Sequence, residues 1–278
     1  MSFISSLISC NFVRKTIALS ALTCISLSAH AHHPFLVPSS TVVSGDAPWI
    51  LVDAGAASNV FEFDHAPLQF DNLSIIGPDG SQIPPDNITR TRFRNSFELQ
   101  LKQIGSYKVD ILNQGFFATY KDQGDIKRWR GAASAMSKEI PATATELQIS
   151  ERISRVETIV THGKPGGKAM EVNGKGLELA FVSHPNDLVA GETAHFRLLL
   201  DGKPAVNVPV EIIPGGKRYR QQLENQTVIT DQDGNVNVNW KTAGLYWLQA
   251  EVKDNTNATP PATSRTSSFV ITLEVLPQ

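Results

Sequence analysis

Cysteine is scarce in this chain: it occurs twice, as Cys10 and Cys24, and both residues lie near the N-terminus. If residues 1–31 are a signal peptide that is removed during export, the mature chain contains no thiol. This excludes disulfides, thiolate metal sites and a cysteine nucleophile from the mature protein. An oxidising compartment suits such a chain, although the chain does not use it for cross-linking.

Long apolar runs and catalytic motifs are also missing. After residue 31 no apolar stretch reaches the roughly 20 residues that a membrane-spanning helix needs. There is no G-x-S-x-G elbow, no H-E-x-x-H pair and no Gly-rich phosphate loop between a strand and a helix. We therefore expect a protein that is not an enzyme and does not span a membrane.

The charge balance gives no reason to expect a nucleic-acid partner. The formal net charge is −2, and it falls to −4 without Arg14 and Lys15, the only two charged residues among the first 31. A mildly acidic chain without a basic stripe is not attracted to phosphate backbones or to anionic membranes.

The first 31 residues have the layout of a secretory signal. Arg14 and Lys15 precede a run of small and apolar residues from Thr16 to Ser28. The run ends in Ala29-His30-Ala31, a cleavage box with small residues at the two positions that the peptidase reads. The alternatives are an uncleaved anchor or a lipoprotein modified at Cys24. We expect a signal peptide over residues 1–31, a mature chain from His32 and a periplasmic location.

The rest of the sequence predicts an all-β protein. Short runs rich in β-branched and aromatic residues alternate with period two and are separated by Gly, Pro, Asn and Asp. We expect two immunoglobulin-like, Greek-key β-sandwich domains in tandem after the cleaved signal peptide. The first covers residues 32–173, with an irregular insertion near 116–150 in which 132–138 can form a helical turn. The second covers residues 174–278, after a Gly- and Lys-rich linker at 162–168.

One acidic turn invites a calcium-binding interpretation. Asp231-Gln232-Asp233-Gly234 begins like an EF-hand loop, but no Glu stands at the twelfth position, near Trp240 and Lys241. A Gly-containing turn between two strands is the better interpretation.

The histidines after residue 31 are the best candidates for binding a metal ion or for other site chemistry. His195 lies in an alternating strand and His162 in the predicted linker, where structural or surface roles are expected. His65 follows Asp64 in a loop, so a carboxylate can orient the ring or share a ligand role. His184 lies in a turn after the first strand of the second domain.

His32 differs from these because cleavage makes it the first residue. Its free α-amine and its imidazole can then bind one ion together, and each gives up a proton at modest cost. His33 supplies a second imidazole beside it. Nitrogen ligands suit Cu, Ni, Co and Zn, with Cu(II) and Ni(II) favoured by the affinity order.

The residues Ala31-His32-His33-Pro34-Phe35-Leu36-Val37-Pro38-Ser39 resemble the mature start of a bacterial periplasmic family of unknown function. Its members begin Ala-His-x-x-Trp-Leu-x-Pro-Ser and are often labelled nickel- or cobalt-uptake periplasmic components (NikM-like), linked with TonB-dependent receptors. Phe35 replaces the usual Trp. Further matching segments are 52–54, 58–59, 63–68, 127–131, 183–188, 214–216 and 246–248.

The resemblance implies a metal-binding accessory protein that serves uptake of nickel, cobalt, iron or copper. Its ligands are expected to be His32, His65 and His184, with His33 and Asp64 as further candidates, and its ion is Ni, Co, Cu, Fe or Zn. The expected partners are a TonB-dependent receptor or an inner-membrane transporter component. Two alternatives remain: an interaction module that docks on an envelope partner through residues 127–131, and a copper oxygenase built on His32.

Overall fold

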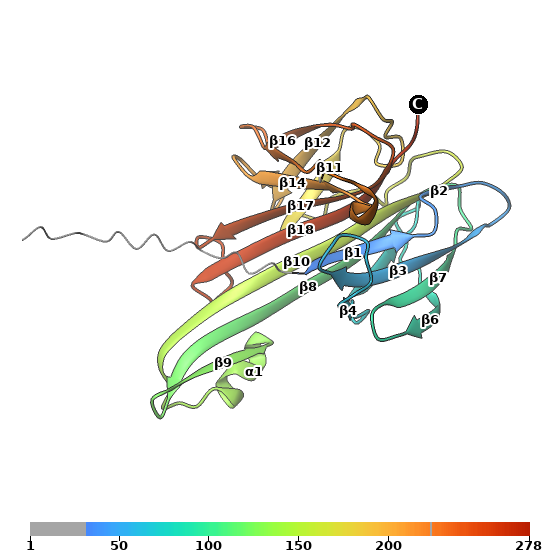
Figure 1. Cartoon of the computed structure of the whole chain (residues 1–278). Helices are drawn as coiled ribbons and strands as arrows, with labels where there is room; N and C mark the ends of the chain where they lie inside the picture. The colour runs from blue at the N-terminus through green and yellow to red at the C-terminus, as the bar shows by residue number, and fades with distance from the viewer. Residues whose placement is uncertain (1–31, 223) are drawn as a thin grey trace, which may run out of the picture. The chain divides into compact units, whose positions relative to one another are not determined.

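The computed structural model describes residues 32–222 and 224–278. The predicted signal peptide, residues 1–31, lies outside the described residues. The regular secondary structure of the described residues is almost entirely β-strand, with a short α-helix and one turn of 3₁₀ helix (Figure 1). The prediction of an all-β protein is confirmed. In the ranges described, no helix is both long enough and apolar enough to cross a membrane.

The first sheet contains the earliest strands of the chain. Its order is β1-β3-β7-β6, with β4 beside β3, and all of these pairs are antiparallel. The strands are β1 (His33–Pro38), β3 (Trp49–Ala57), β4 (Ala66–Pro67), β6 (Asp86–Arg90) and β7 (Asn95–Gln100).

The second sheet is the largest and draws strands from both halves of the chain. Its order is β15-β14-β17-β18-β10-β8-β5, with β2 beside β10 and β9 beside β8. The strands are β2 (Val42–Val43), β5 (Leu73–Ile76), β8 (Gly105–Asp122), β9 (Asp125–Gly131), β10 (Thr145–His162), β14 (Pro209–Pro214), β15 (Gln226–Ile229), β17 (Gly244–Asp254) and β18 (Ser264–Val275). The parallel pairing of β10 with β18 joins the two halves.

The third sheet belongs to the C-terminal half. It contains β11 (Leu177–Phe181), β12 (Thr193–Leu200), β13 (Lys203–Pro204) and β16 (Asn235–Asn239). The 3₁₀ turn η1 (Lys217–Tyr219) follows β14. The acidic segment before β16 is a turn, as predicted: the N–H of Gly234 donates to the carbonyl of Asp231 at 3.0 Å.

The second sheet lies between the other two and is covered on both faces. Neighbouring residues of a strand point to opposite faces, so one strand can serve two cores. On β17, Trp247 packs into the core that contains Phe35 of the first sheet. Its neighbours Tyr246 and Leu248 pack into the core that contains Trp240, beside the third sheet. The fold is therefore a pair of sandwiches that share their middle sheet.

The predicted boundary between residues 173 and 174 separates the strands of the first sheet from those of the third. The second sheet crosses this boundary through β10 and β18. Residues 32–278 form one compact unit. That the two halves are separate domains stays a prediction.

The segment near 116–150 is regular, and the prediction of an irregular insertion there is wrong. β8 and β10 continue as a long antiparallel pair, β9 adds a third strand on the other side of β8, and α1 (Ala133–Glu139) follows (Figure 1). Phe116, Ala118 and Tyr120 alternate along β8 and are buried with Met136 and Ile140. The alternation is short, and the helix that covers it is local, so the sequence signal is weak. The expected helical turn is present.

Candidate functional site

Two histidines from different segments meet at one end of β3. The imidazole rings of His32 and His65 are stacked, with centroids 3.2 Å apart and planes 3° from parallel. His32 precedes β1 and His65 precedes β4, and these two strands pair with the last residues of β3, at Ala57 and Ala56. Both histidines are exposed. Strand pairing thus brings together two rings that lie far apart in the sequence.

Aromatic packing fixes the turn that carries His65. Phe61 and Phe63 lie edge-on against Phe35, with ring centroids 5.4 and 5.2 Å away. Phe35 lies on β1, the strand that follows His32, and is fully buried. Edge-to-face aromatic contacts are favourable beyond the area they bury. They tie the His65 turn to the same strand that positions His32.

The neighbours Asp64 and His33 have other partners. Asp64 Oδ1 accepts a hydrogen bond from the N–H of Ser58 at 3.0 Å, which closes the turn before β4. His33 is half-buried, with Nδ1 3.4 Å from the carbonyl oxygen of Ala57. Its ring lies edge-on to Trp247 at 4.8 Å. His33 therefore packs against the core, whereas Asp64 stabilises the loop beside the stacked rings.

His184 lies toward the opposite end of β1. Its Nε2 is 2.9 Å from Ser106 Oγ, and its Nδ1 accepts the N–H of Asn186 at 3.1 Å. Ser106 also contacts Thr161, which pairs with β2, the strand after β1. β1 has six residues, about 20 Å at roughly 3.3 Å per residue, and separates this network from His32. Burial lowers the pKa of the His184 ring, and the structure does not bring it to the stacked pair.

The stacked pair supplies two side-chain ligands. Within residues 32–222 and 224–278, no group of three or more His, Cys, Asp or Glu side chains is placed to hold a metal ion. An ion held by His32 and His65 therefore needs a third donor of another kind. The chain offers one if His32 becomes the first residue.

The two remaining histidines have structural roles. His162 is the last residue of β10 and is 5% exposed, so the prediction that it lies in a flexible linker is wrong. Its ring nitrogens lie 3.1 Å from the carbonyl oxygen of Gln103 and 2.9 Å from that of Gly45. His195 is exposed on β12, with Nδ1 2.7 Å from Asn237 Oδ1, as expected for a surface strand residue.

A second group of charged side chains is buried at β8 and β10. Arg155 is fully buried, and its Nη1 donates to Asp110 Oδ2 at 2.7 Å. The same nitrogen is 3.4 Å from Glu157 Oε1, and Nη2 is 3.6 Å from Glu178 Oε1. Lys108, which is 8% exposed, lies on the same strand as Asp110. These five residues are called the ionic cluster below.

Two carboxyl groups of the ionic cluster, those of Asp110 and Glu157, have a raised pKa. Burial, reinforced by the nearby carboxylate of Asp110, raises the pKa of Glu157 to about 7. Burial also raises the pKa of Asp110, although Arg155 opposes this shift. Desolvation disfavours a charged carboxylate, and neighbouring carboxylates add to the effect. The cluster is therefore poised to gain or lose a proton near neutral pH.

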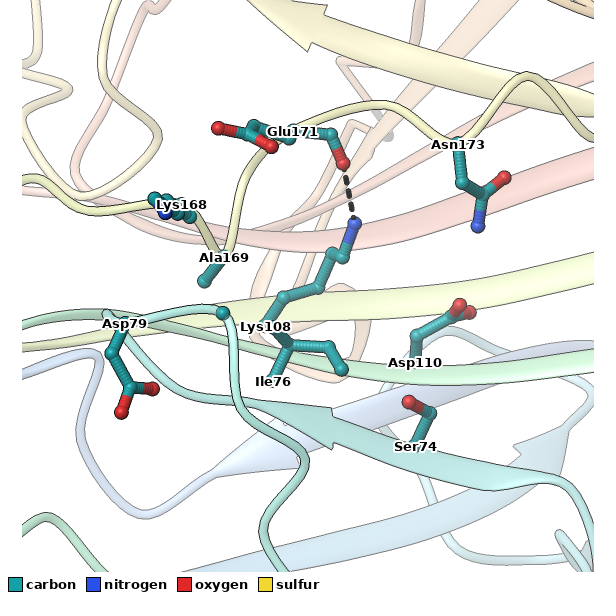
Figure 2. A pocket seen from close by; sticks show the side chains of 10 residues that line it. Ser74, Ile76, Asp79, Lys108, Asp110, Lys168, Ala169, Glu171 and Asn173 are labelled. Atoms are coloured by element: carbon teal, nitrogen blue, oxygen red, sulfur yellow. Dashed lines mark hydrogen bonds between the residues drawn. The ribbon is translucent and has the colours of Figure 1, made fainter.

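A cleft of about 440 Å³ opens beside the ionic cluster (Figure 2). It lies between β5, β8 and the segment at 168–173, and is called the Asp110 cleft below. Ser74 and Asp110 line one side of it, and Asn173 and Glu171 line the other. The Nζ of Lys108 crosses the cleft and donates to the carbonyl oxygen of Glu171 at 3.1 Å.

The comparison with protein families gives a match over most of the sequence. The model described as "Domain of unknown function (DUF4198)" matches residues 29–254. The chain belongs to the DUF4198 family. This confirms the resemblance to a family of unknown function, and the match supplies no activity. No curated protein matches this DUF4198 chain.

Solved structures similar to the DUF4198 chain include immunoglobulin-like and adhesion proteins. The human OSCAR ligand-binding domain is 13% identical, with a TM-score of 0.21, and the match covers 89% of this chain and 100% of that one. The D0-D1 domain of intimin is also 13% identical, with a TM-score of 0.20 and coverage of 86% and 96%.

The ionic cluster of this DUF4198 protein was not among the predicted sites. In the sequence, Lys108 and Asp110 flank Val109, and Arg155 and Glu157 flank Val156. Such alternation predicts a strand with one polar, solvent-facing side. One signal in the sequence could have indicated burial: each of the two strands carries one basic and one acidic residue on the same face. A solvent-exposed face does not need such matched charges. Both faces are covered, so these charges are buried.

Proposed function

We propose that this protein is a periplasmic accessory protein that binds a transition metal ion through His32 and His65. It serves the uptake of nickel, cobalt, iron or copper, together with a TonB-dependent receptor or an inner-membrane transporter component. The observation that carries the proposal is the stacking of the two exposed imidazoles at 3.2 Å. The proposed role is binding and delivery rather than catalysis.

The two rings are close enough to become ligands of one ion after they reorient. Imidazole nitrogens bind such metals at about 2.0–2.1 Å, so two of them at a right angle are about 3 Å apart. In the stack the two ring planes are parallel, so the in-plane nitrogen lone pairs do not converge, and the rings must rotate to direct one nitrogen each at a shared ion. Two exposed rings can also move without disturbing a core.

The third ligand in this proposal is the α-amine of His32. Export and cleavage after Ala31 create this amine, which then lies on the same residue as one of the two rings. The amine and the two imidazoles make a set of three nitrogen donors. Such a set favours Cu(II) or Ni(II) in a square-planar arrangement. The copper-oxygenase alternative requires two rings on opposite sides of copper, which the stacked pair does not provide.

Metal titration of two forms of the protein tests the role of the amine. One form begins at His32, and the other carries one extra residue before His32. We expect Cu(II) and Ni(II) to bind the first form at least tenfold more tightly, or about 1.4 kcal/mol. Equal affinity in both forms would remove the amine from the site. Elemental analysis of untagged protein from the periplasm identifies the native ion.

The alternative, an envelope interaction module, is favoured by the exposure of β9. Ile126 is 69% exposed on this strand, which pairs with β8 along one edge. Trp129 is only half-buried, and its Nε1 donates to Glu139 at 2.7 Å, so it helps to hold α1. Binding to a receptor candidate that survives a chelator but is lost in Ile126→Asp would favour this function over metal delivery.

A further inference from the structure

The Asp110 cleft contains a buried acceptor without a partner. Asp110 Oδ2 is bound to Arg155, but Oδ1 has no hydrogen-bond partner among the described residues. The Asp110 side chain is 8% exposed, and it lines the cleft (Figure 2). An unsatisfied buried carboxylate oxygen is unfavourable unless a donor reaches it. Oδ1 itself is shielded from solvent, so the carboxyl group must rotate toward the cleft before a donor there can reach this oxygen.

The charges of the ionic cluster do not balance. Asp110, Glu157 and Glu178 carry three negative charges when ionised, against the two positive charges of Arg155 and Lys108. All five side chains are buried. A buried excess charge is stabilised by a proton or by an additional cation. Asp110 lines the cleft, so an additional cation can bind to the cluster at this residue.

The walls of the cleft orient further polar groups toward the same space. Asn173 Oδ1 accepts hydrogen bonds from Arg155 Nη2 and from the N–H of Lys175, both at 3.1 Å. This fixes its amide, and Figure 2 shows the amide nitrogen on the side of Asp110. Ser74 is the residue of β5 that pairs directly with Asp110 of β8, and both line the cleft. The cleft therefore offers a carboxylate and a hydroxyl as acceptors.

From these observations we propose that the Asp110 cleft binds a small organic molecule through a protonated primary amine. The ammonium group donates to Asp110 Oδ1 and to Ser74 Oγ, and its charge balances the ionic cluster. A primary ammonium has three N–H donors on a compact charge, which suits adjacent oxygen acceptors. The volume of about 440 Å³ is in the range of small-molecule sites.

A metal ion is a poorer occupant of the cleft than an amine. Calcium takes six to eight oxygen ligands, and magnesium takes six in near-octahedral geometry. Over the described residues, no three His, Cys, Asp or Glu side chains are placed to hold a metal ion. An amine needs fewer acceptors and can leave its carbon chain in the open part of the cleft. This site is independent of the metal proposed at His32 and His65.

The test uses purified protein and three probes: propylamine hydrochloride, tetramethylammonium chloride and propan-1-ol. Binding is followed by calorimetry and by NMR chemical-shift changes at neutral pH. We expect saturable binding of propylamine, at least about tenfold tighter than that of the other two probes. Tetramethylammonium has the charge without N–H donors, and propanol has a donor without the charge. Equal binding of all three, or no saturable propylamine binding, would overturn the proposal.

Two variants locate the binding. Asp110→Asn removes the charge, and Ser74→Leu fills the cleft while it leaves the ionic cluster intact. Each is expected to weaken propylamine binding at least about tenfold. Asp79→Asn, at an exposed carboxylate on the rim, is the matched control and should bind as the wild type does. If Asp110→Asn does not fold, Ser74→Leu decides: unchanged binding in this folded variant would contradict the assignment.

Discussion

The guanidinium of Arg155 donates to the carboxylate of Asp110 at 2.7 Å, and both side chains are buried in the second sheet. Their residues lie on the paired strands β10 and β8. Arg155 also faces Glu157 and Glu178, so one cation serves three carboxylates.

Replacing Arg155 by Ala should destabilise the protein strongly near neutral pH. The variant leaves three buried carboxylates without their main cation, and breaking a buried pair costs about 3–5 kcal/mol. Urea unfolding measures the change. Arg94→Ala is the control, because the Arg94–Asp53 pair has an arginine side chain that is 49% exposed and should contribute less than about 1 kcal/mol. Similar losses in the two variants would contradict the prediction.

Glu157 should make the protein less stable as the pH rises toward neutral. Its pKa in the folded protein is raised to about 7, so the folded state holds a proton that the unfolded chain releases at lower pH. The stabilisation is fully present below about pH 4.5 and is lost as the pH rises through about 7, by roughly 3 kcal/mol.

Unfolding free energies across this range, in the wild type and in Glu157→Gln, check the prediction. The Gln variant binds no proton at this position, so its stability should fall less with pH. Asp110 contributes in the same direction, because its pKa is raised too, and the difference between the two curves reports Glu157 together with its effect on Asp110. Parallel curves would show that Glu157 is not the titrating group.

Amine binding in the Asp110 cleft should strengthen as the pH rises from about 6 to about 8, because a bound cation and a proton on the cluster compete. The charged groups around Glu157 are Asp110 and Lys108 on β8, Arg155 on β10 and Glu178 on β11. Calorimetry in buffers of different ionisation enthalpy should detect release of a proton on binding. Affinity that is independent of pH over this range would refute the competition.

His65→Ala should weaken Cu(II) and Ni(II) binding by about tenfold or more, because the variant removes one of two ring ligands. His184→Ala is the matched control, since both of its ring nitrogens have partners within the protein, away from the stacked pair. Its metal affinity should equal that of the wild type. A loss in His184→Ala as large as that in His65→Ala would mean that the ligand set has been assigned wrongly.

Trp247→Phe should loosen the attachment of β1. Trp247 Nε1 donates to the carbonyl oxygen of Pro34 at 2.8 Å, and its ring lies against His33. Phe leaves this carbonyl without its donor, which costs about 1–3 kcal/mol. Urea unfolding measures the loss. Trp49→Phe, at a side chain that is 51% exposed, should change the stability by no more than about 0.5 kcal/mol.

The sequence by itself determined the strands and several turns. Alternation with period two sets which residues of a strand share a face. Gly234 indicates the turn before β16, and this turn depends on the local sequence rather than on tertiary packing. It also singled out His32 and His65, whose approach follows from strand pairing at the end of β3. The third predicted ligand, His184, is brought instead to Ser106 and Asn186.

Only the tertiary structure decided which faces meet water. Alternation does not show whether a second layer covers the polar side of a strand, because that depends on elements distant in the sequence. The parallel pairing of β10 with β18 places the shared sheet between two others, and this buries Arg155 and its carboxylates. The same long-range packing leaves His32 and His65 exposed and adjacent, while it encloses His162. The local pattern fixes the direction of each side chain, and the global stacking of sheets fixes its surroundings.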